Sequence, residues 1–182
     1  MKRILYTIMV LTVVGLASGM GLVFVYRYAA PRIAENQQTE TKEAIFKVFP
    51  KADSYEVSEG QNEVFLVKDK SGRKIGYVFT AKGNGYQGEI KLIAGIKNDL
   101  KTLTGIEILE SQETPGLGQE ITGMDFRKQF RGLVAEPLIT YIKGREPGSK
   151  NQIQTITGAT ISSKAVVGIL NARIDELRDG GL

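Results

Sequence analysis

The sequence predicts an α+β protein, in which one N-terminal transmembrane helix precedes a domain with a twisted, mainly antiparallel sheet and flanking helices. Three observations predict this class. The chain begins with a long uncharged apolar run, its middle alternates apolar and polar residues between turn signals, and its end carries a helical apolar stripe. The predicted divisions are a transmembrane anchor at 1–30, a juxtamembrane helix at 31–50 and a single folded domain at 51–182.

The apolar run at residues 4–26 contains no charged side chain, and at about 1.5 Å of rise per residue it spans a hydrocarbon core of about 30 Å. A cleaved signal peptide would need a shorter apolar segment and a small-x-small cleavage site. The candidate site before Ala30 has Arg27 where a small residue is required, so we expect an uncleaved, single-pass anchor in the cell (inner) membrane. The short N-terminal tail favours a cytoplasmic N-terminus and an extracytoplasmic domain.

Two further features mark the first fifty residues. Gly15 and Gly19 have the spacing of close helix packing in membranes, although Gly is also common in membrane helices that have no partner. Pro31 is expected to break the chain just outside the membrane. Residues 33–48 are mostly good helix formers and Pro50 closes the pattern, so a second helix is predicted to lead into the domain.

Alternating apolar and polar residues on either side of turn-forming residues predict two β-hairpins in the middle of the chain. Between the hairpins, residues 83–88 hold three glycines. A phosphate-binding glycine loop would need a different spacing and a βαβ setting, so a bulged turn is the preferred interpretation. The predicted strands are 63–68, 75–79, 89–96 and 102–109, and the two hairpin turns are 69–73 and 98–99.

The second half of the chain opens on a tight turn, where Pro115 followed by Gly116 predicts a positive φ angle at the glycine. The apolar side chain of this turn, Leu117, fits either a small packing cluster or a cover over a flat aromatic ligand. The remaining predicted elements are a short helix at 125–130, a strand at 137–142, a polar loop at 144–150, a strand end at 153–156 and an amphipathic helix at 162–177.

Hydroxyl-bearing and small residues gather at 155–163, where a strand gives way to the last helix. The first amides of a helix have no partner within the helix, and the helix dipole favours negative charge there, so this turn suits a phosphate group. A plain helix N-cap, with small residues chosen for close packing, explains the same residues. The motif taken alone leaves both interpretations open.

The composition excludes several kinds of chemistry. Cys, His and Trp are absent, which rules out thiolate metal sites, iron–sulfur clusters held by this chain and a histidine general base. Redox chemistry would therefore need an organic cofactor. The net charge of +4 is spread along the chain without a basic cluster, so we expect no nucleic-acid partner.

Two motifs together carry a family resemblance. Glu113-Thr114-Pro115-Gly116-Leu117-Gly118, followed later by Thr157-Gly158-Ala159-Thr160 at the start of the last helix, resembles the FMN-binding domain family. Members of this family serve in Rnf-type ion-translocating electron-transport complexes and in related Nqr-type quinone reductases. The resemblance also includes the N-terminal membrane helix and the Gly-Tyr-x-Gly stretch at 85–88, and therefore covers almost the whole chain.

The resemblance implies FMN bound covalently through a phosphoester to Thr160, attached by a separate flavin transferase. Thr114 to Leu117 would then line the isoalloxazine ring, and Ser162 and Ser163 would donate to phosphate oxygens. One position departs from the family pattern, because Gln154 stands where an acidic residue is usual. We predict no catalytic acid or base and no metal ligand; the other predicted cofactor-binding residues are Thr157, Gly158, Ala159, Glu113, Thr114, Pro115, Gly116 and Leu117.

The function that this resemblance implies is that of an electron-carrier subunit in a membrane-bound Rnf-type complex. Such a complex couples electron transfer between ferredoxin and NAD to the movement of Na⁺ or H⁺. The expected partners are other membrane subunits of the complex and, during maturation, the flavin transferase. Two alternatives remain: a non-catalytic, membrane-tethered binding or assembly module, and a flavoprotein of extracellular electron transfer that works outside any ion pump.

Overall fold

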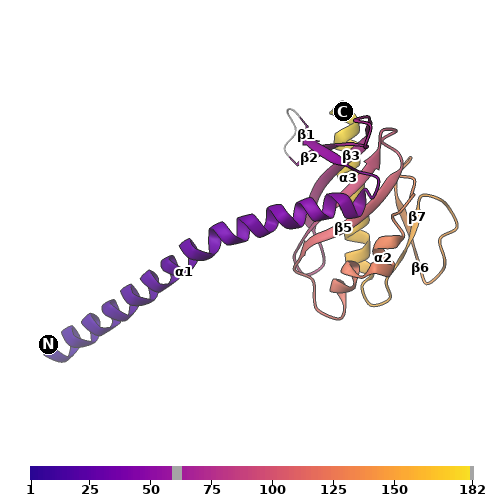
Figure 1. Ribbon diagram of the computed structural model, residues 1–182. Coiled ribbons are helices and arrows are strands. Elements are labelled where there is room, and N and C mark those ends of the chain that lie inside the picture. The colour runs from indigo at the N-terminus through magenta and orange to yellow at the C-terminus, as the bar shows by residue number, and fades with distance from the viewer. Residues whose placement is uncertain (59–62, 181–182) are drawn as a thin grey trace. The chain divides into compact units, whose positions relative to one another are not determined.

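The computed structural model describes residues 1–58 and 63–180, and the chain divides into two compact units, Met1–Glu40 and Thr41–Leu182. One long helix begins the chain, and strands and shorter helices follow it (Figure 1). The predicted α+β class is confirmed, because the second unit contains a mostly antiparallel sheet and helices.

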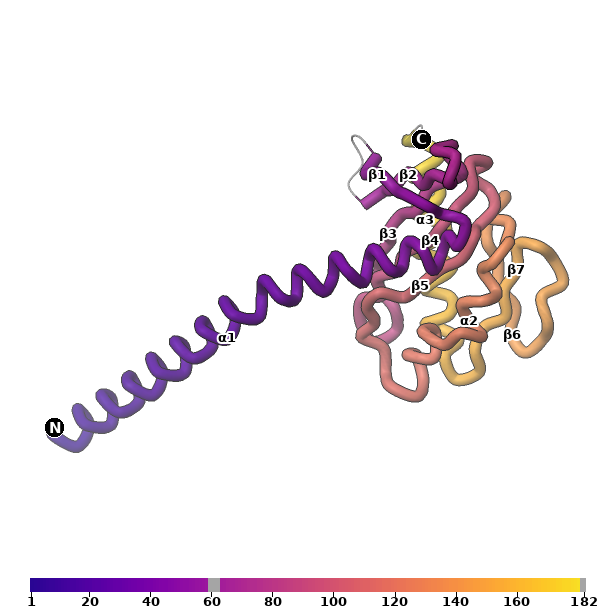
Figure 2. Tube along the Cα trace, in the orientation of Figure 1, coloured from indigo at the N-terminus to yellow at the C-terminus, as the bar shows by residue number. Residues whose placement is uncertain are grey.

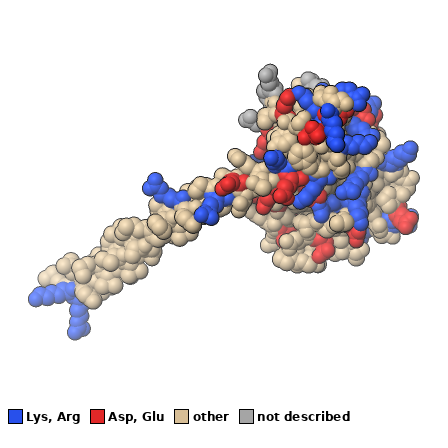
Figure 3. Space-filling model, viewed as in Figure 1, with Lys and Arg blue, Asp and Glu red and all other residues tan. Residues whose placement is uncertain are grey.

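Helix α1 extends over Lys2–Val48 without interruption at Pro31, so the predicted break at this proline is wrong. A proline inside a helix removes only its own backbone hydrogen bond and crowds one carbonyl of the preceding turn. Helix-forming residues on both sides continue the pattern. Among the described residues, α1 is the one helix long and apolar enough to cross a membrane. Its apolar run carries no Lys, Arg, Asp or Glu between basic residues near its two ends (Figure 3).

The second unit is built on a five-stranded antiparallel sheet in which the strands follow chain order. Figure 2 traces the chain through this unit. Both predicted hairpins are confirmed, and one short edge strand, β1, was not predicted. Strand β3 continues well beyond its predicted end and forms a third hairpin with β4. The strands are β1 (Ser54–Val57), β2 (Val64–Lys68), β3 (Lys74–Asn84), β4 (Glu89–Lys97) and β5 (Leu103–Ser111).

Each face of the sheet is covered by helix. On one face, the C-terminal end of α1 packs its buried residues Ile45 and Val48 with Phe49 against apolar side chains of β2, β3 and β4. Gly76 and Gly95 leave room for the Phe49 ring, since a Cβ atom would lie 2.7 and 3.2 Å from it, respectively. On the other face lies the larger core, in which helix α3 (Thr160–Asp179) buries its apolar stripe (Figure 1).

The segment between β5 and α3 contains two short helical turns and a second sheet. The helical turns are η1 (Gly118–Thr122) and α2 (Met124–Lys128), and the strands are β6 (Thr140–Lys143) and β7 (Gln152–Thr155). Strands β6 and β7 pair in parallel, with Lys143 opposite Thr155. The predicted strands at these places are confirmed, but their pairing with each other was not predicted.

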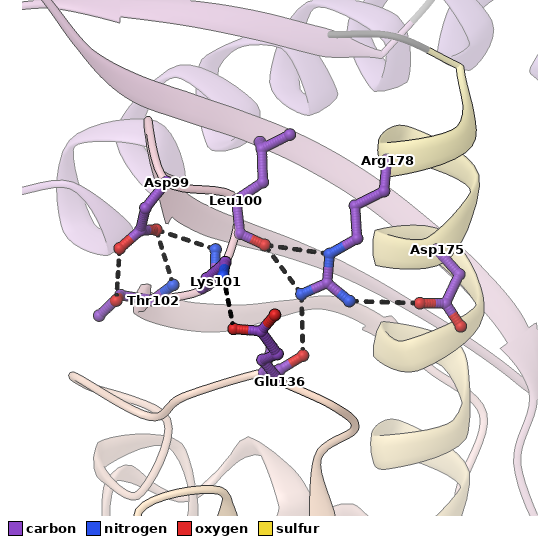
Figure 4. Close-up of polar contacts among 8 residues, drawn as sticks. Asp99, Leu100, Lys101, Thr102, Glu136, Asp175 and Arg178 are labelled. Carbon is purple, nitrogen blue, oxygen red and sulfur yellow. Dashed lines mark hydrogen bonds and ion pairs between the residues drawn. The ribbon is translucent and has the colours of Figure 1, made fainter.

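The C-terminal part of α3 is fixed by Arg178 (Figure 4). Its guanidinium donates to the backbone carbonyl of Leu100, at 3.2 Å from Nε and 2.9 Å from Nη2, and Nη2 also donates to the carbonyl of Ala135 at 2.9 Å. Beside this contact, the Asp99 carboxylate accepts from the amides of Lys101 and Thr102 and shapes the β4–β5 turn. These contacts hold α3 against the sheet and so fix where its N-terminal end lies.

Candidate functional site

Three segments that are far apart in the sequence meet around one buried carboxylate. The Glu113 side chain is 5% exposed. Its Oε1 accepts from the backbone amides of Tyr86 at 2.7 Å and Gln87 at 3.0 Å, and its Oε2 accepts from Ser162 Oγ at 2.6 Å. We call this arrangement of Glu113, the two amides and Ser162 the Glu113 clasp. It joins the β3–β4 turn, the turn after β5 and the first turn of α3.

Two glycines give the Glu113 clasp its space. A Cβ atom at Gly85 would lie 2.1 Å from Glu113 Oε1, and one at Gly118 would lie 2.2 Å from Oε2 and 2.7 Å from Ser162 Oγ. The glycine-rich stretch therefore allows a carboxylate, not a phosphate, to approach the backbone. The prediction of a turn here is confirmed, because the Gly85 amide donates to the carbonyl of Gly88 at 2.7 Å. The predicted bulge is wrong: the β3–β4 pairing continues in register to Asn84 and Glu89.

The Glu113 clasp also controls the charge of its carboxyl group. Burial acts to raise the pKa of Glu113, but the hydrogen bond from Ser162 and those from the amides of Gln87 and Tyr86 outweigh it and hold the pKa below its usual value. The group is therefore ionised in the folded protein at neutral pH. A buried carboxylate of this kind contributes stability at neutral pH through the bonds it accepts.

This contribution has a definite pH dependence. Because the folded-state pKa of Glu113 is lowered, its stabilisation is fully present above the unfolded-state pKa of about 4.3 and is lost as the pH falls toward the folded-state value. We expect Glu113→Gln to lower the free energy of unfolding at pH 7 by about 1–3 kcal/mol. The difference between variant and wild type should shrink below about pH 4.3. Urea unfolding of the full chain in detergent at pH 7, 5 and 4 measures this, and a difference independent of pH would contradict it.

The turn that follows Glu113 has the predicted backbone conformation. Gly116 has φ +73°, which confirms the prediction made from the Pro-Gly pair, and the amide of Leu117 donates to the carbonyl of Thr114 at 3.2 Å. Leu117 remains 53% exposed at the tip of this turn. Its Cδ2 atom would lie 3.6 Å from a Cβ atom at Gly158, so the two turns touch. Gly158 has φ +87°, a left-handed conformation that favours glycine.

Helix α3 begins at Thr160, two residues earlier than predicted. Ala159 occupies the cap position and makes no side-chain capping bond, so Thr160 is not the N-cap of this helix. The Thr160 hydroxyl donates only a long hydrogen bond, 3.4 Å, to the carbonyl of Ile156. Its side chain therefore stands half-buried in the first turn of the helix with its oxygen weakly engaged.

Ser162 and Ser163 have structural roles that were not predicted, and their contact with a phosphate stays a prediction. Both side chains are buried. Ser162 donates to Glu113, and Ser163 Oγ accepts from the amide of Ile156 at 3.1 Å and donates to the carbonyl of Ala159 at 2.9 Å. The backbone amides in the first turn of the helix, which have no partner within it, are further donors for a phosphate at this helix end.

The tips of these segments surround a pocket of about 450 Å³. It brings together six of the predicted cofactor-binding residues, namely Thr114, Leu117, Gly158, Ala159, Thr160 and Ser162. Glu113 lies behind the pocket in the clasp, and Pro115, Gly116 and Ser163 do not line it. Thr157 lines a neighbouring pocket of about 760 Å³ instead, beside Gln154.

Four further lining residues were not among the predicted site residues: Tyr86, Gly118, Lys143 and Ile161. Tyr86 and Gly118 lie inside the quoted glycine-containing motifs, so the motifs themselves were the signal that marked them. Ile161 directly follows the predicted acceptor. Nothing in the sequence marked Lys143 as a pocket residue, because its position beside the pocket depends on the parallel pairing of β6 with β7.

Comparison with known proteins agrees with this geometry. The model of the FMN-binding domain family matches residues 85–175, a range that includes all three segments of the site. The G subunit of an ion-translocating oxidoreductase complex from Methanosarcina acetivorans is 35% identical over 96% of this chain and 94% of its own length. The chain belongs to the FMN-binding domain family, in its RnfG branch.

Two further comparisons agree with this assignment. The G subunit of a Na⁺-translocating ferredoxin:NAD⁺ oxidoreductase complex from Acetobacterium woodii is 37% identical over 76% of this chain and 70% of its own length. The crystal structure of NqrC from Shewanella oneidensis matches with a TM-score of 0.57 at 20% identity, over 71% of this chain and 68% of that one. The structural match shows that the FMN-binding fold is shared.

The pocket of this family member fits the cofactor that its domain name implies. A flavin offers a flat aromatic ring system and a phosphate at the end of a flexible chain. The exposed side chains of Tyr86 and Leu117 provide an aromatic and an apolar surface for the ring. Thr160 and the first amides of the 20-residue helix α3 provide a hydroxyl and an electropositive helix end for the phosphate.

Proposed function

We propose that this chain is a covalent-FMN electron-carrier subunit of a membrane-bound Rnf-type complex. The observation that carries the proposal is the Thr160 hydroxyl. It lies in the first turn of α3, is weakly hydrogen-bonded and lines the same pocket as Tyr86 and Leu117. A phosphoester at this oxygen would tether FMN with its ring system beside those two side chains.

The start of α3 suits such a phosphodiester for electrostatic reasons. A phosphodiester keeps one negative charge, which the N-terminal end of a helix stabilises through its unpaired amides and its dipole. Gly158 and Ala159 present little side chain in front of this helix end, which leaves access for a flavin transferase during maturation. Gln154, at the position where the family pattern has an acidic residue, lines the neighbouring pocket together with Thr157.

The chain's own residues would position the flavin without acid–base catalysis. FMN, when bound, supplies the one- and two-electron chemistry. Lys143 is the one charged side chain among the described residues lining the pocket, and no carboxylate faces the pocket to exchange protons. The electrons would therefore pass through the tethered ring, while Leu117 and Tyr86 cover part of it from water.

The proposed setting of this carrier is a membrane complex. The apolar part of α1 would anchor the chain in the cell membrane with the second unit on the extracytoplasmic side, where a covalent bond prevents loss of the cofactor. Relatives named as subunits of ion-translocating oxidoreductases support partners of the same kind. The complex would couple transfer between ferredoxin and NAD to movement of Na⁺ or H⁺.

The intact mass of the full-length chain tests this proposal. After co-expression with an active flavin transferase, we expect the mass of the polypeptide plus one FMN less one water. A carrier that is already flavinylated by the same transferase, expressed in parallel, controls for transferase activity. An unmodified mass beside a modified control would contradict the proposal and favour a membrane-tethered assembly module.

A further inference from the structure

Lys143 is placed beside the proposed flavin by the backbone itself. It is the last residue of β6 and pairs with Thr155, the last residue of β7. Five residues after Thr155, the chain reaches Thr160 at the start of α3. Because both strands belong to one small sheet, the backbone of Lys143 has a fixed position relative to the segment that carries the Thr160 hydroxyl. Its exposed side chain lines the pocket together with Thr160 and Leu117.

The pocket lining, within the described chain, holds no negatively charged side chain to pair with the Lys143 ammonium. The residues lining the pocket within the described chain include no Asp or Glu, and the Glu113 carboxylate is satisfied behind it by three donors. Within residues 1–58 and 63–180, the Lys143 ammonium makes no ion pair or side-chain hydrogen bond. By contrast, the nearby Lys164 stacks on the ring of Tyr141, 4.9 Å from its centroid, and does not line the pocket.

The Lys143 ammonium would lie near the isoalloxazine ring of the flavin, and the charge of this ring changes when it is reduced. When an isoalloxazine ring takes up two electrons and one proton, it gains one net negative charge. The electrons come from an upstream redox centre and the proton comes from solvent. A fixed positive charge near the ring lowers the free energy of the reduced form more than that of the oxidised form. It therefore raises the reduction potential of the flavin.

We propose that the positive charge of Lys143 raises the reduction potential of the flavin held at Thr160. This inference rests on the proposed function, since it requires FMN at that oxygen. Lys143 lies on a strand that neither family motif includes, and it is the one residue through which the parallel β6–β7 pair reaches the site. The small second sheet thus has a role in tuning the cofactor as well as in supporting α3.

The test compares the full-length flavinylated protein with its Lys143→Met variant. Both are purified in detergent, their covalent FMN is confirmed by intact mass, and each is titrated with dithionite against redox mediators. We expect the equilibrium constant for two-electron reduction to fall about tenfold in the variant, which is about 30 mV lower in potential. Lys143→Arg keeps the charge and should retain the wild-type potential. Lys164→Met is the matched control, because it removes a nearby charge that does not face the pocket, and it should also leave the potential unchanged.

Each other outcome has a distinct meaning. A wild-type chain without FMN mass contradicts the proposed function itself. A flavinylated Lys143→Met variant with the wild-type potential, or a Lys143→Arg variant shifted as far as Lys143→Met, overturns the role of this charge. Loss of FMN from Lys143→Met, with normal flavinylation of Lys143→Arg, also overturns it, because Lys143 would then act on attachment of the flavin and not on its potential.

Discussion

We expect Thr160→Val to abolish the covalent attachment of FMN that we propose at this residue, and to leave the fold intact. Valine keeps the β-branched shape of threonine but has no oxygen to form a phosphoester. The hydroxyl that is lost makes only a 3.4 Å hydrogen bond to the Ile156 carbonyl, so its removal costs less than about 1 kcal/mol of stability. Intact mass should show the bare polypeptide, and a denaturing gel should show no flavin fluorescence at the position of the variant.

Two further variants make this result specific to one oxygen. Thr160→Ser keeps a hydroxyl at the same place and should retain covalent FMN. Thr157→Val removes the other hydroxyl of the Thr-Gly-Ala-Thr motif, whose side chain lines the neighbouring pocket, and it should also be flavinylated. Flavin fluorescence in the denatured Thr160→Val variant, or its disappearance from Thr157→Val alone, would assign the phosphoester to another residue.

The features predicted correctly from the sequence are those decided by local chemistry. Pro115 and Gly116 require a particular turn whatever surrounds them, and Gly116 has the positive φ angle that this turn needs. The β2–β3 hairpin is similarly local, since the Asp69 carboxylate accepts from the amides of Ser71 and Arg73 within its own turn. Such bonds join residues at most four positions apart, so a short stretch of sequence contains all of their determinants.

The features that were missed depend on contacts between distant segments. Glu113 was predicted to bind the cofactor, which stays a prediction, but its bonds to Tyr86 and Ser162, which are 27 and 49 residues away, were not predicted. The hydroxyl of Ser162 was predicted to donate to phosphate, and its hydrogen bond to Glu113 was not predicted. The neighbours of Lys143 follow from the pairing of β6 with β7. The residues of β6 are mostly exposed, so the hydrophobic pattern gives little indication that this strand pairs with β7.

These long-range contacts explain why two glycine-containing motifs occur together. The motif at 85–88 and the motif at 113–118 each supply a glycine that faces the Glu113 carboxylate, and α3 supplies Ser162. Neither glycine needs a ligand to account for it. The two glycines act on the pocket indirectly: they make room for the Glu113 clasp, which holds the tips of both turns, including Tyr86 and Leu117, against the end of α3.

The Glu113 clasp predicts a large and non-additive effect on stability. Glu113→Ala leaves the amides of Tyr86 and Gln87 and the Ser162 hydroxyl without their acceptor, which should lower the free energy of unfolding by about 2–4 kcal/mol. Gly118→Ala places a methyl group where the contacts are 2.2 Å to Glu113 Oε2 and 2.7 Å to Ser162 Oγ, and should cost about 1–3 kcal/mol. Unfolding of the full chain in detergent, followed by the near-ultraviolet circular dichroism of its tyrosines, measures both values.

The double variant Glu113→Ala/Gly118→Ala tests whether the two residues stabilise the site as one arrangement or independently. Once Glu113 is Ala, the new methyl group at position 118 no longer meets the carboxylate oxygen, and the Ser162 hydroxyl can rotate away. Of its three nearest contacts, only the one of 2.9 Å to the Cβ atom of residue 113 then remains. The combined loss should therefore be smaller than the sum of the two single losses by at least about 1 kcal/mol. Gly72→Ala is the control. Its φ angle of +73° makes alanine unfavourable there as well, but no atom lies within 4 Å of its Cβ position, so the cost comes from the backbone conformation alone. Its cost should add in full to that of Glu113→Ala. Strict additivity at Gly118 would mean that Glu113 and Gly118 stabilise the site independently, and that carboxylate and glycine are not parts of one arrangement.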